Sequence, residues 1–331
     1  MFEKICIYGA GAIGGWIGAQ LAAAGHPVGV VARGATLAAL RAHGLRLREG
    51  PDADAREQAL PVTATDQPAE LGAQDLVIIA VKAPAMADVA RAIGPLIGPR
   101  TVALTAMNGV PWWFLQGFGG ALAGRTLQSV DPGGAIARAM AAAHVLGCVV
   151  HASCLTDAPG VIRHHGGQEL IVGEPAGGHS DRVQALADLL RQAGFEAPVS
   201  TQIQKDIWYK LWGNMTFNPI CAITGVTTDL VLDDELARGF VSAVMLEARE
   251  IGARIGVPIA QTPQDRHAVT RRLGAMKPSM LQDVEAGRAV ELDALVGSVR
   301  ELGQLTGVPT PFTDALLGLA RLHARARGLY P

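Results

Sequence analysis

The sequence predicts an α/β protein in which a doubly wound, parallel sheet is followed by an all-helical C-terminal domain. Three observations carry this prediction. The chain has 331 residues, enough for about two domains. Continuous apolar segments alternate with helical patterns in its first part, as in parallel sheets that helices cover on both faces. Beyond about residue 200 only long helical patterns remain, so we expect domains at 1–200 and 201–331.

The apolar pattern places the strands and helices of the first domain. Residues 4–8 are typical of a short buried strand, residues 12–24 of a helix that ends at Gly25, and residues 28–32 of a second strand. Further strands are expected at 76–81 and 101–105, each after a plausible helix. The stretch 126–174 has a stronger β character, with candidate strands at 145–150, 160–163 and 170–173.

The second domain is expected to be helical throughout. It contains no convincing strand, no internal repeat and no low-complexity linker. The apolar spacing predicts helices at 204–217, 236–255, 263–276, 292–306 and 313–327.

Composition and charge exclude several classes of protein. Apolar residues make up 49% of the chain, enough for a sizeable core, which excludes a disordered or fibrous protein. The net charge of −2 provides no basic field, so neither nucleic acid nor an anionic membrane is an expected partner. The four cysteines are too few and too scattered for a disulfide framework or a metal site, which fits a reducing cytoplasm: Cys6, Cys148, Cys154 and Cys221. The adjacent His164 and His165 do not have the spacing of a metal-binding motif either.

The uncharged stretch 5–32 superficially resembles a signal peptide or a membrane span. Seven glycines interrupt it, however, and its apolar pattern changes from strand to glycine turn to helix and back to strand. A spanning segment would need about 20 predominantly apolar residues in one unbroken helix. We therefore expect a soluble, cytoplasmic protein that does not contact a membrane.

A glycine motif joins the first expected strand to the first expected helix. Gly9-Ala10-Gly11-Ala12-Ile13-Gly14 matches G-x-G-x-x-G in the strand-to-helix context that makes this motif informative. The first glycine permits a tight turn, the second lets the backbone approach a pyrophosphate, and the third allows close packing of helix on strand. The N–H groups and dipole at the start of the helix favour the same anion. The motif predicts a Rossmann-type dinucleotide site, with an ordinary glycine-rich loop as the alternative.

The end of the second expected strand bears on the choice of cofactor. NAD enzymes usually place an acid there, about 20 residues beyond the glycines, to bind the ribose 2′-hydroxyl. This chain has Arg33 instead, and a guanidinium suits a 2′-phosphate. The sequence therefore favours NADP over NAD. A solvated arginine with no ligand is the alternative.

Two more polar residues follow expected strands, at the edge where doubly wound sheets bind ligands. Lys82 ends the segment L-V-I-I-A-V-K, and Asn108 stands in Met107-Asn108-Gly109 after the strand at 101–105. A solvated strand end and a simple turn explain these two residues equally well.

One helix carries the most informative polar pattern outside the glycine turn. Lys210, Asn214 and Asn218 are spaced i, i+4 and i+8, so one face of an otherwise apolar helix holds an ammonium and two carboxamides. Asparagine is a poor helix former, and the pattern suits a ligand such as a 2-oxo acid, which needs a cation and several hydrogen bonds. The alternative is that the asparagines cap or kink the helix before Pro219.

Two residues further on have ordinary explanations by default. Ser279, in K-P-S-M-L-Q-D, is expected to be the N-cap of a helix, with Gln282 at the capping-box position. Glu291 lies between apolar residues in A-V-E-L-D, where a solvated acid is the plain interpretation.

Taken in order, these motifs resemble the ketopantoate reductase (2-dehydropantoate 2-reductase) family over nearly the whole chain. The series is G-A-G-A-I-G, Ala80-Val81-Lys82, Asn108-Gly109, K-L-W-G-N-M-T-F-N-P, S-M-L-Q-D and V-E-L-D. The resemblance implies a Rossmann domain, a helical C-terminal domain, and NADPH-dependent reduction of a 2-oxo acid. It also implies a place in pantothenate and coenzyme A biosynthesis.

Matched position by position, the resemblance implies roles for single residues. Lys210 matches the general acid that donates a proton to the ketone oxygen, and Glu291 the active-site acid that holds Lys210 or a substrate hydroxyl in place. Asn108, Asn214, Asn218 and Ser279 match substrate-binding positions. Cofactor-binding positions are matched by Gly9, Ala10, Gly11, Ala12, Ile13, Gly14, by Arg33 at the 2′-phosphate, and by Lys82, Asn108 and Glu291.

The chain departs from the family pattern beside Asn108. Met107 stands where many members carry glutamine, and the bulky Trp112, Trp113 and Phe114 follow closely, either as core packing or as part of the pocket. Two alternatives therefore stay open: an NADPH reductase of another 2-oxo acid or of an imine, and a non-catalytic NADP-sensing protein. A homodimer is plausible, although no interface signature is evident.

Overall fold

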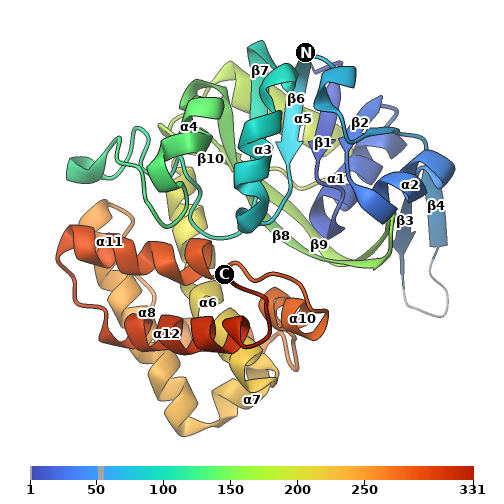
Figure 1. Ribbon diagram of the computed structural model, residues 1–331. Helices are drawn as coiled ribbons and strands as arrows, with labels where there is room; N and C mark the ends of the chain where they lie inside the picture. The colour runs from blue at the N-terminus through green and yellow to red at the C-terminus, as the bar shows by residue number, and fades with distance from the viewer. Residues whose placement is uncertain (1, 51–55) are drawn as a thin grey trace. The chain divides into compact units, whose positions relative to one another are not determined.

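The computed structural model of the protein describes residues 2–50 and 56–331 (Figure 1). The chain forms two compact units. The first comprises residues 1–107 and 135–203, and the second comprises residues 108–134 and 204–331. An α/β unit and a helical unit are the architecture that the sequence predicts, so the predicted fold class is confirmed.

The described strands of the first unit form one mixed sheet. Its strand order is β4-β3-β9-β8-β7-β6-β1-β2-β5, and β10 pairs with β9. The central strands β6, β1 and β2 are parallel neighbours, whereas the pairs β3–β4 and β8–β9 are antiparallel. The strands are β1 (Ile5–Tyr8), β2 (Val28–Val31), β3 (Leu45–Glu49), β4 (Arg56–Leu60), β5 (Thr63–Thr65), β6 (Gln74–Ile79), β7 (Ile97–Ala106), β8 (Val145–Ala158), β9 (Val161–Gly173) and β10 (Val199–Ser200).

The predicted strands around the glycine turn are confirmed, but two expectations for the sheet are wrong. The sheet is not wholly parallel, and the segments at 160–163 and 170–173 belong to one continuous strand, β9. The residues between them, H-H-G-G-Q-E, look like a turn because they are polar and contain two glycines. Backbone pairing with β8 continues through them because much of that stretch is exposed on one side, where polar side chains are tolerated.

Helices cover both faces of this sheet. Leu76 and Ile78 of β6 join the apolar cluster beneath α1, while their fully buried neighbours Val77 and Ile79 point to the opposite face. Trp16 of α1 is completely buried and stacks on His164 of β9, with ring centroids 5.0 Å apart. The helices of this unit are α1 (Ala12–Ala23), α2 (Gly34–His43), α3 (Met86–Ala92), α4 (Ala135–Ala139) and α5 (Asp181–Gln192), with short 3₁₀ turns η2 (Pro68–Glu70), η3 (Ala83–Ala85), η4 (Gly94–Leu96) and η7 (Ala142–His144).

The second unit is helical in its described residues. None of the described helices combines the length and apolar character needed to cross a membrane. Its elements are α6 (Ile203–Thr224), α7 (Thr228–Asp233), α8 (Glu235–Ile255), α9 (Pro263–Arg271), α10 (Ser279–Glu285), the π-helical turn η8 (Asp293–Gly297), α11 (Ser298–Thr306) and α12 (Pro311–Arg325), with 3₁₀ turns η5 (Gly120–Leu122) and η6 (Pro132–Gly134).

The helices predicted at 236–255 and 313–327 are confirmed to within two residues, and two other predicted helix ends are wrong. α6 does not stop at 217 but continues through Pro219 to Thr224. A proline inside a helix costs about 3 kcal/mol, and we attribute the continuation to the burial of residues 220–222 beyond it. α9 ends at Arg271 rather than near 276, because the chain turns at Gly274 with φ +63°.

Candidate functional site

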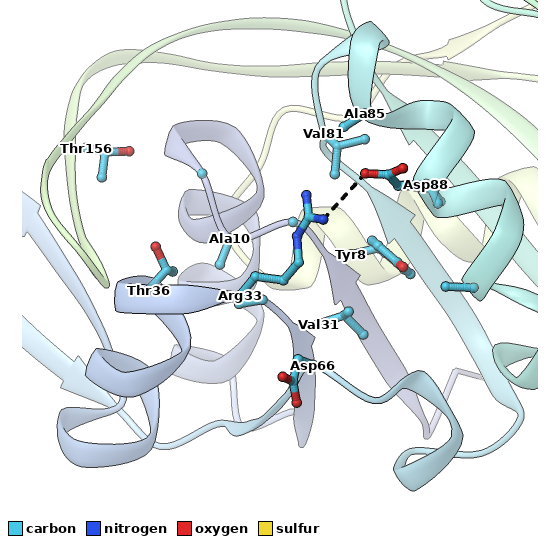
Figure 2. Close-up of a pocket in the computed structure, with 15 residues that line it drawn as sticks. Tyr8, Ala10, Val31, Arg33, Thr36, Asp66, Val81, Ala85, Asp88 and Thr156 are labelled. Atoms are coloured by element: carbon cyan, nitrogen blue, oxygen red, sulfur yellow. Dashed lines mark hydrogen bonds and ion pairs between the residues drawn. The ribbon is translucent and has the colours of Figure 1, made fainter. Parts of the chain in front are cut away.

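The first unit contains a cavity of about 310 Å³ at the carboxyl ends of β1 and β2 (Figure 2). We call it the cofactor pocket. It lies where a doubly wound sheet offers ligands the ends of its strands and the start of its first helix. Its lining residues are Tyr8, Gly9, Ala10, Gly11, Val31, Ala32, Arg33, Thr36, Asp66, Val81, Ala85, Asp88, Val89, Ala92 and Thr156.

The glycine turn forms the floor of the cofactor pocket. Gly9 adopts φ +98°, and a Cβ atom there would lie 2.5 Å from Cγ1 of Val81. A Cβ atom on Gly14 would lie 2.0 Å from the carbonyl oxygen of Gly9, so this glycine lets α1 pack closely against the turn. A Cβ atom on Gly11, in contrast, would meet nothing within 4 Å. The backbone at Gly11 is therefore open to a ligand.

The start of α1 can receive an anion. Gly11 is its N-cap, no side chain caps the helix, and its first turn contains no acid. Ala12 and Ile13, the first two helical residues, are half-buried. Uncapped N–H groups and the helix dipole favour a pyrophosphate at this point. The residues present therefore fit the dinucleotide that the motif predicts.

Arg33 reaches into the cofactor pocket from the end of β2, immediately before α2. Its side chain is 73% exposed, and Nη1 lies 3.4 Å from Oδ2 of Asp88 on α3 (Figure 2). Asp88 also pairs with Arg91 of the same helix. Burial raises the pKa of the nearby Tyr8 hydroxyl while the charge of Arg33 lowers it, so Tyr8 is neutral at pH 7. Arg33 is thus an exposed cation of the pocket lining that pairs with Asp88.

Lys82 follows β6 and immediately precedes η3. Lys82 is half-buried at the carboxyl edge of the sheet. Its neighbour Val81 lines the cofactor pocket. The predicted cofactor role of Lys82 stays a prediction.

In the second unit, α6 brings Lys210 to Asn108. Nζ of Lys210 donates a hydrogen bond to Oδ1 of Asn108 over 2.9 Å. Asn108 is the second residue after the end of β7, and its segment belongs to the helical unit. Two residues that are 102 positions apart in the chain thus meet, and both are half-buried.

The two asparagines of α6 lie one and two turns beyond Lys210. Asn214 is half-buried, and Asn218 is buried, with its Nδ2 3.4 Å from Oγ of Ser279. The helix continues past both residues, so neither caps it. The N-cap prediction for Ser279 is wrong: Pro278 is the N-cap of α10, and Ser279 is the first helical residue. Its hydroxyl is therefore available to Asn218.

Glu291 stands immediately before the helical run that begins at Leu292 and includes η8. It is half-buried, and its carbonyl accepts a hydrogen bond from the N–H of Leu295 over 3.2 Å. The aromatic residues after Asn108 are core packing: Trp112 and Trp113 are 4% and 1% exposed, and Phe114 packs against Trp208 of α6.

Three charged residues near the predicted site residues were not predicted from the sequence: Asp66, Asp88 and Arg266. Asp88 and Asp66 line the cofactor pocket, although only Asp66 follows a strand, β5, in a way that spacing could have revealed. In the second unit, the guanidinium of Arg266 lies 5.1 Å from the ring centre of Tyr209 and against Gly213. In the described residues, no cluster of three or more acidic, histidine or cysteine side chains is placed to hold a metal ion.

Known proteins resemble this chain along its whole length. A model of the family described as "Ketopantoate reductase PanE/ApbA" matches residues 5–113, and a model of that family's C-terminal domain matches residues 202–324. A curated 2-dehydropantoate 2-reductase from Mesorhizobium japonicum is 47% identical over 328 residues, which cover 99% of each chain.

Solved structures agree with this similarity. A candidate ketopantoate reductase from Ralstonia solanacearum MolK2 has 56% identity, a TM-score of 0.93 and complete coverage of both chains. D-Mandelate dehydrogenase, solved with NADH and anilino(oxo)acetate, has a TM-score of 0.82 over 98% of this chain at 22% identity, which shows a common fold. Two domain models and a full-length relative agree with the order of motifs along the sequence, and the chain belongs to the ketopantoate reductase family.

Proposed function

We propose that this protein is an NADP-dependent oxidoreductase that reduces 2-dehydropantoate to pantoate, as part of pantothenate and coenzyme A biosynthesis. The single observation that carries the proposal furthest is the full-length similarity to a curated 2-dehydropantoate 2-reductase, in a chain that also pairs Lys210 with Asn108. A pure sensor of NADP would not need an ammonium held in this way.

The cofactor choice rests on the cofactor pocket. Gly11 leaves the backbone open to a pyrophosphate, and Arg33 supplies a cation at the end of β2, where an NAD enzyme would usually carry an acid. We therefore propose NADP, with its 2′-phosphate at Arg33 and its pyrophosphate at Gly9, Ala10, Gly11 and the first turn of α1. Lys82, Asn108 and Glu291 are proposed as further cofactor-binding residues.

The chemistry assigns a proton-transfer role to Lys210. NADPH, when bound, supplies a hydride to the ketone carbon. The Lys210 ammonium donates a hydrogen bond to the ketone oxygen, stabilises the negative charge that develops there, and then transfers its proton to give the alcohol. Asn108 accepts one ammonium hydrogen and so fixes the direction of the other two. Glu291 is proposed to hold Lys210 or a substrate hydroxyl.

The rest of the substrate site follows along α6. We propose that Asn214, Asn218 and Ser279 bind the polar groups of the 2-oxo acid, with the pair Asn218–Ser279 acting as one unit. The proposed division of labour is cofactor binding by residues 1–200 and substrate binding by 201–331, with Asn108 contributing to both. We also propose that the protein is cytoplasmic and forms a homodimer. Light scattering, which measures the molar mass in solution, tests the dimer.

The test is oxidation of NADPH, followed by its absorbance, with 2-dehydropantoate beside a panel of other 2-oxo acids and an NADH control. Turnover on 2-dehydropantoate supports the proposal. Turnover only on another 2-oxo acid changes the substrate, and NADPH binding without any turnover replaces the reductase by a sensor.

A further inference from the structure

A backbone carbonyl of the helical unit holds the loop that carries Asn108. The N–H of Val110 donates a hydrogen bond to the carbonyl oxygen of Ala294 over 2.8 Å. Ala294 lies in the π-helical turn η8, two residues after Leu292 and three after Glu291. This bond joins the loop that holds Asn108 to the turn that begins beside Glu291.

The π-helical register makes that carbonyl available. In an α-helix the N–H of Ser298 would bond the carbonyl of Ala294. Here the N–H of Ser298 bonds the carbonyl of Asp293 instead, one residue earlier. The freed carbonyl of Ala294 accepts the N–H of Val110 and also the hydroxyl of Ser298, over 2.8 Å. π-Helical turns of this kind occur frequently at functional sites.

Gly109 permits the close approach. It adopts φ +82°, and a Cβ atom on it would lie 2.5 Å from the carbonyl oxygen of Ala294 and 2.8 Å from its Cβ atom. These separations are too short for any side chain, and the obstacle is backbone that cannot rotate away. Glycine at this position is therefore required for the loop to sit on η8.

We propose that the Gly109–Ala294 junction is a positioning element for Lys210. It acts through Asn108, because it holds the neighbouring residue so that Oδ1 lies 2.9 Å from Nζ of Lys210. It also fixes that loop relative to the turn that follows Glu291. Gly109, Ala294 and Ser298 touch neither substrate nor cofactor in this scheme; they set the direction of the ammonium. The inference rests on the role proposed for Lys210 and adds the residues that make this role possible.

The test compares Gly109→Ala with Gly124→Ala in the full-length protein. Both glycines have nearly the same positive φ, +82° and +80°, but a Cβ atom on Gly124 meets nothing within 4 Å. The backbone strain is thus matched, and only the contact with Ala294 differs. We expect Gly109→Ala to lower kcat at least tenfold, since displacing a catalytic group by about 1 Å can cost about 100-fold. Gly124→Ala should stay within about twofold of the parent, with an unchanged Kd of NADPH.

A double-mutant cycle separates positioning from general damage. If the junction acts through Asn108, then adding Gly109→Ala to Asn108→Ala lowers kcat by no more than about twofold further. A full additional loss of kcat in the Asn108→Ala background overturns the proposal. Ser298→Ala is the milder variant should Gly109→Ala not fold; it should lower kcat about two- to fivefold with the same non-additivity, since it removes one neutral hydrogen bond.

A readout independent of turnover distinguishes failure of this inference from failure of the proposed reaction. Acetylation of lysines by acetic anhydride, followed by peptide mass spectrometry, reports how well the amine of Lys210 is held, with the exposed Lys205 of the same helix as internal reference. We expect Gly109→Ala to raise the labelling of Lys210 relative to Lys205 at least threefold, and Gly124→Ala to leave it unchanged. An unchanged ratio in Gly109→Ala overturns the junction. A parent protein inactive on every 2-oxo acid would overturn only the reaction.

Discussion

The cofactor pocket differs in construction from the polar side chains along α6, which we call the Lys210 cluster: Asn108, Lys210, Asn214, Asn218 and Ser279. The glycine turn of the pocket is shaped by backbone, with close approach at Gly9 and Gly14 and an open position at Gly11. The Lys210 cluster is built from side chains that meet across 102 positions, for Asn108 and Lys210, and across 61, for Asn218 and Ser279. A site made of backbone is encoded in short spacings. A site made of side chains depends on contacts that exist only after the chain has folded.

The largest effect is expected where the side-chain site does its chemistry. Lys210→Ala should lower kcat by about 10²–10⁴, the usual contribution of a general acid, with little change in the Kd of NADPH. Steady-state kinetics and a binding titration measure the two quantities. Lys205→Ala, on the exposed side of the same helix, is the matched control and should retain full activity. If Lys210→Ala turned over substrate as fast as the parent, Lys210 would not be the general acid, and the Lys210 cluster would not be the site of the chemistry.

The next largest effect concerns Arg33, the cation proposed to bind the 2′-phosphate. Arg33→Asp should shift the preference for NADPH over NADH at least tenfold, or about 1.4 kcal/mol, because it replaces the cation by the acid that NAD enzymes favour. The ratio of kcat/KM for the two cofactors is the measurement. Arg41→Asp, at an exposed position of α2 outside the pocket lining, should leave this ratio unchanged. An unchanged ratio in Arg33→Asp means that the 2′-phosphate is bound elsewhere.

A smaller effect is expected from the second pair on α6. Ser279→Ala removes the hydroxyl that Asn218 contacts, and a single neutral hydrogen bond of this kind changes KM for the 2-oxo acid by about three- to tenfold. NADPH affinity should not change. Ser242→Ala is the control, because the half-buried hydroxyl of Ser242 bonds the carbonyl of Arg238 in its own helix. If KM stays constant while kcat falls, Ser279 acts on the chemical step instead of on binding.

The smallest effect tests the ion pair at the pocket rim. In the structure Asp88 pairs with Arg33, and a 2′-phosphate would have to replace it as partner. Asp88→Asn should therefore tighten NADPH binding about two- to fivefold, as expected for an exposed ion pair. Asp188→Asn, which loses an exposed pair with Arg191 on α5, controls for the change of charge. Weaker binding by Asp88→Asn would show that Asp88 orients Arg33 for the phosphate rather than competing with it.

The same contrast explains what the sequence could predict. The first helix, the strands that flank it and the position of Arg33 follow from glycine spacing and from apolar runs, both of which act within a few residues. The i, i+4, i+8 spacing placed Lys210, Asn214 and Asn218 together because a helix repeats at short range. The glycine turn, the position of Arg33 in the pocket lining and one face of α6 were therefore predictable.

The rest depends on partners far away in the chain. Nothing in the sequence near Asn108 indicates that residues 108–134 pack with the helical unit. The local pattern after Glu291 predicts an ordinary α-helix, whereas the structure has a π-helical turn in which the carbonyl of Ala294 accepts the N–H of Val110. Ser279 stands in a sequence typical of a capping box, but it is the first residue of α10 and its hydroxyl contacts Asn218. In each case tertiary contact overrides local preference.

The distribution of tryptophans gives the molecule a built-in optical label. Trp16 is the single tryptophan of the first unit, whereas Trp112, Trp113, Trp208 and Trp212 all belong to the second. The difference in fluorescence between the parent and a Trp16→Phe variant therefore reports on the first unit alone. Because Trp16 is fully buried against His164, its emission changes when that unit opens. Followed through a denaturant titration, this one ring reveals whether the two units unfold as a single cooperative body or one after the other.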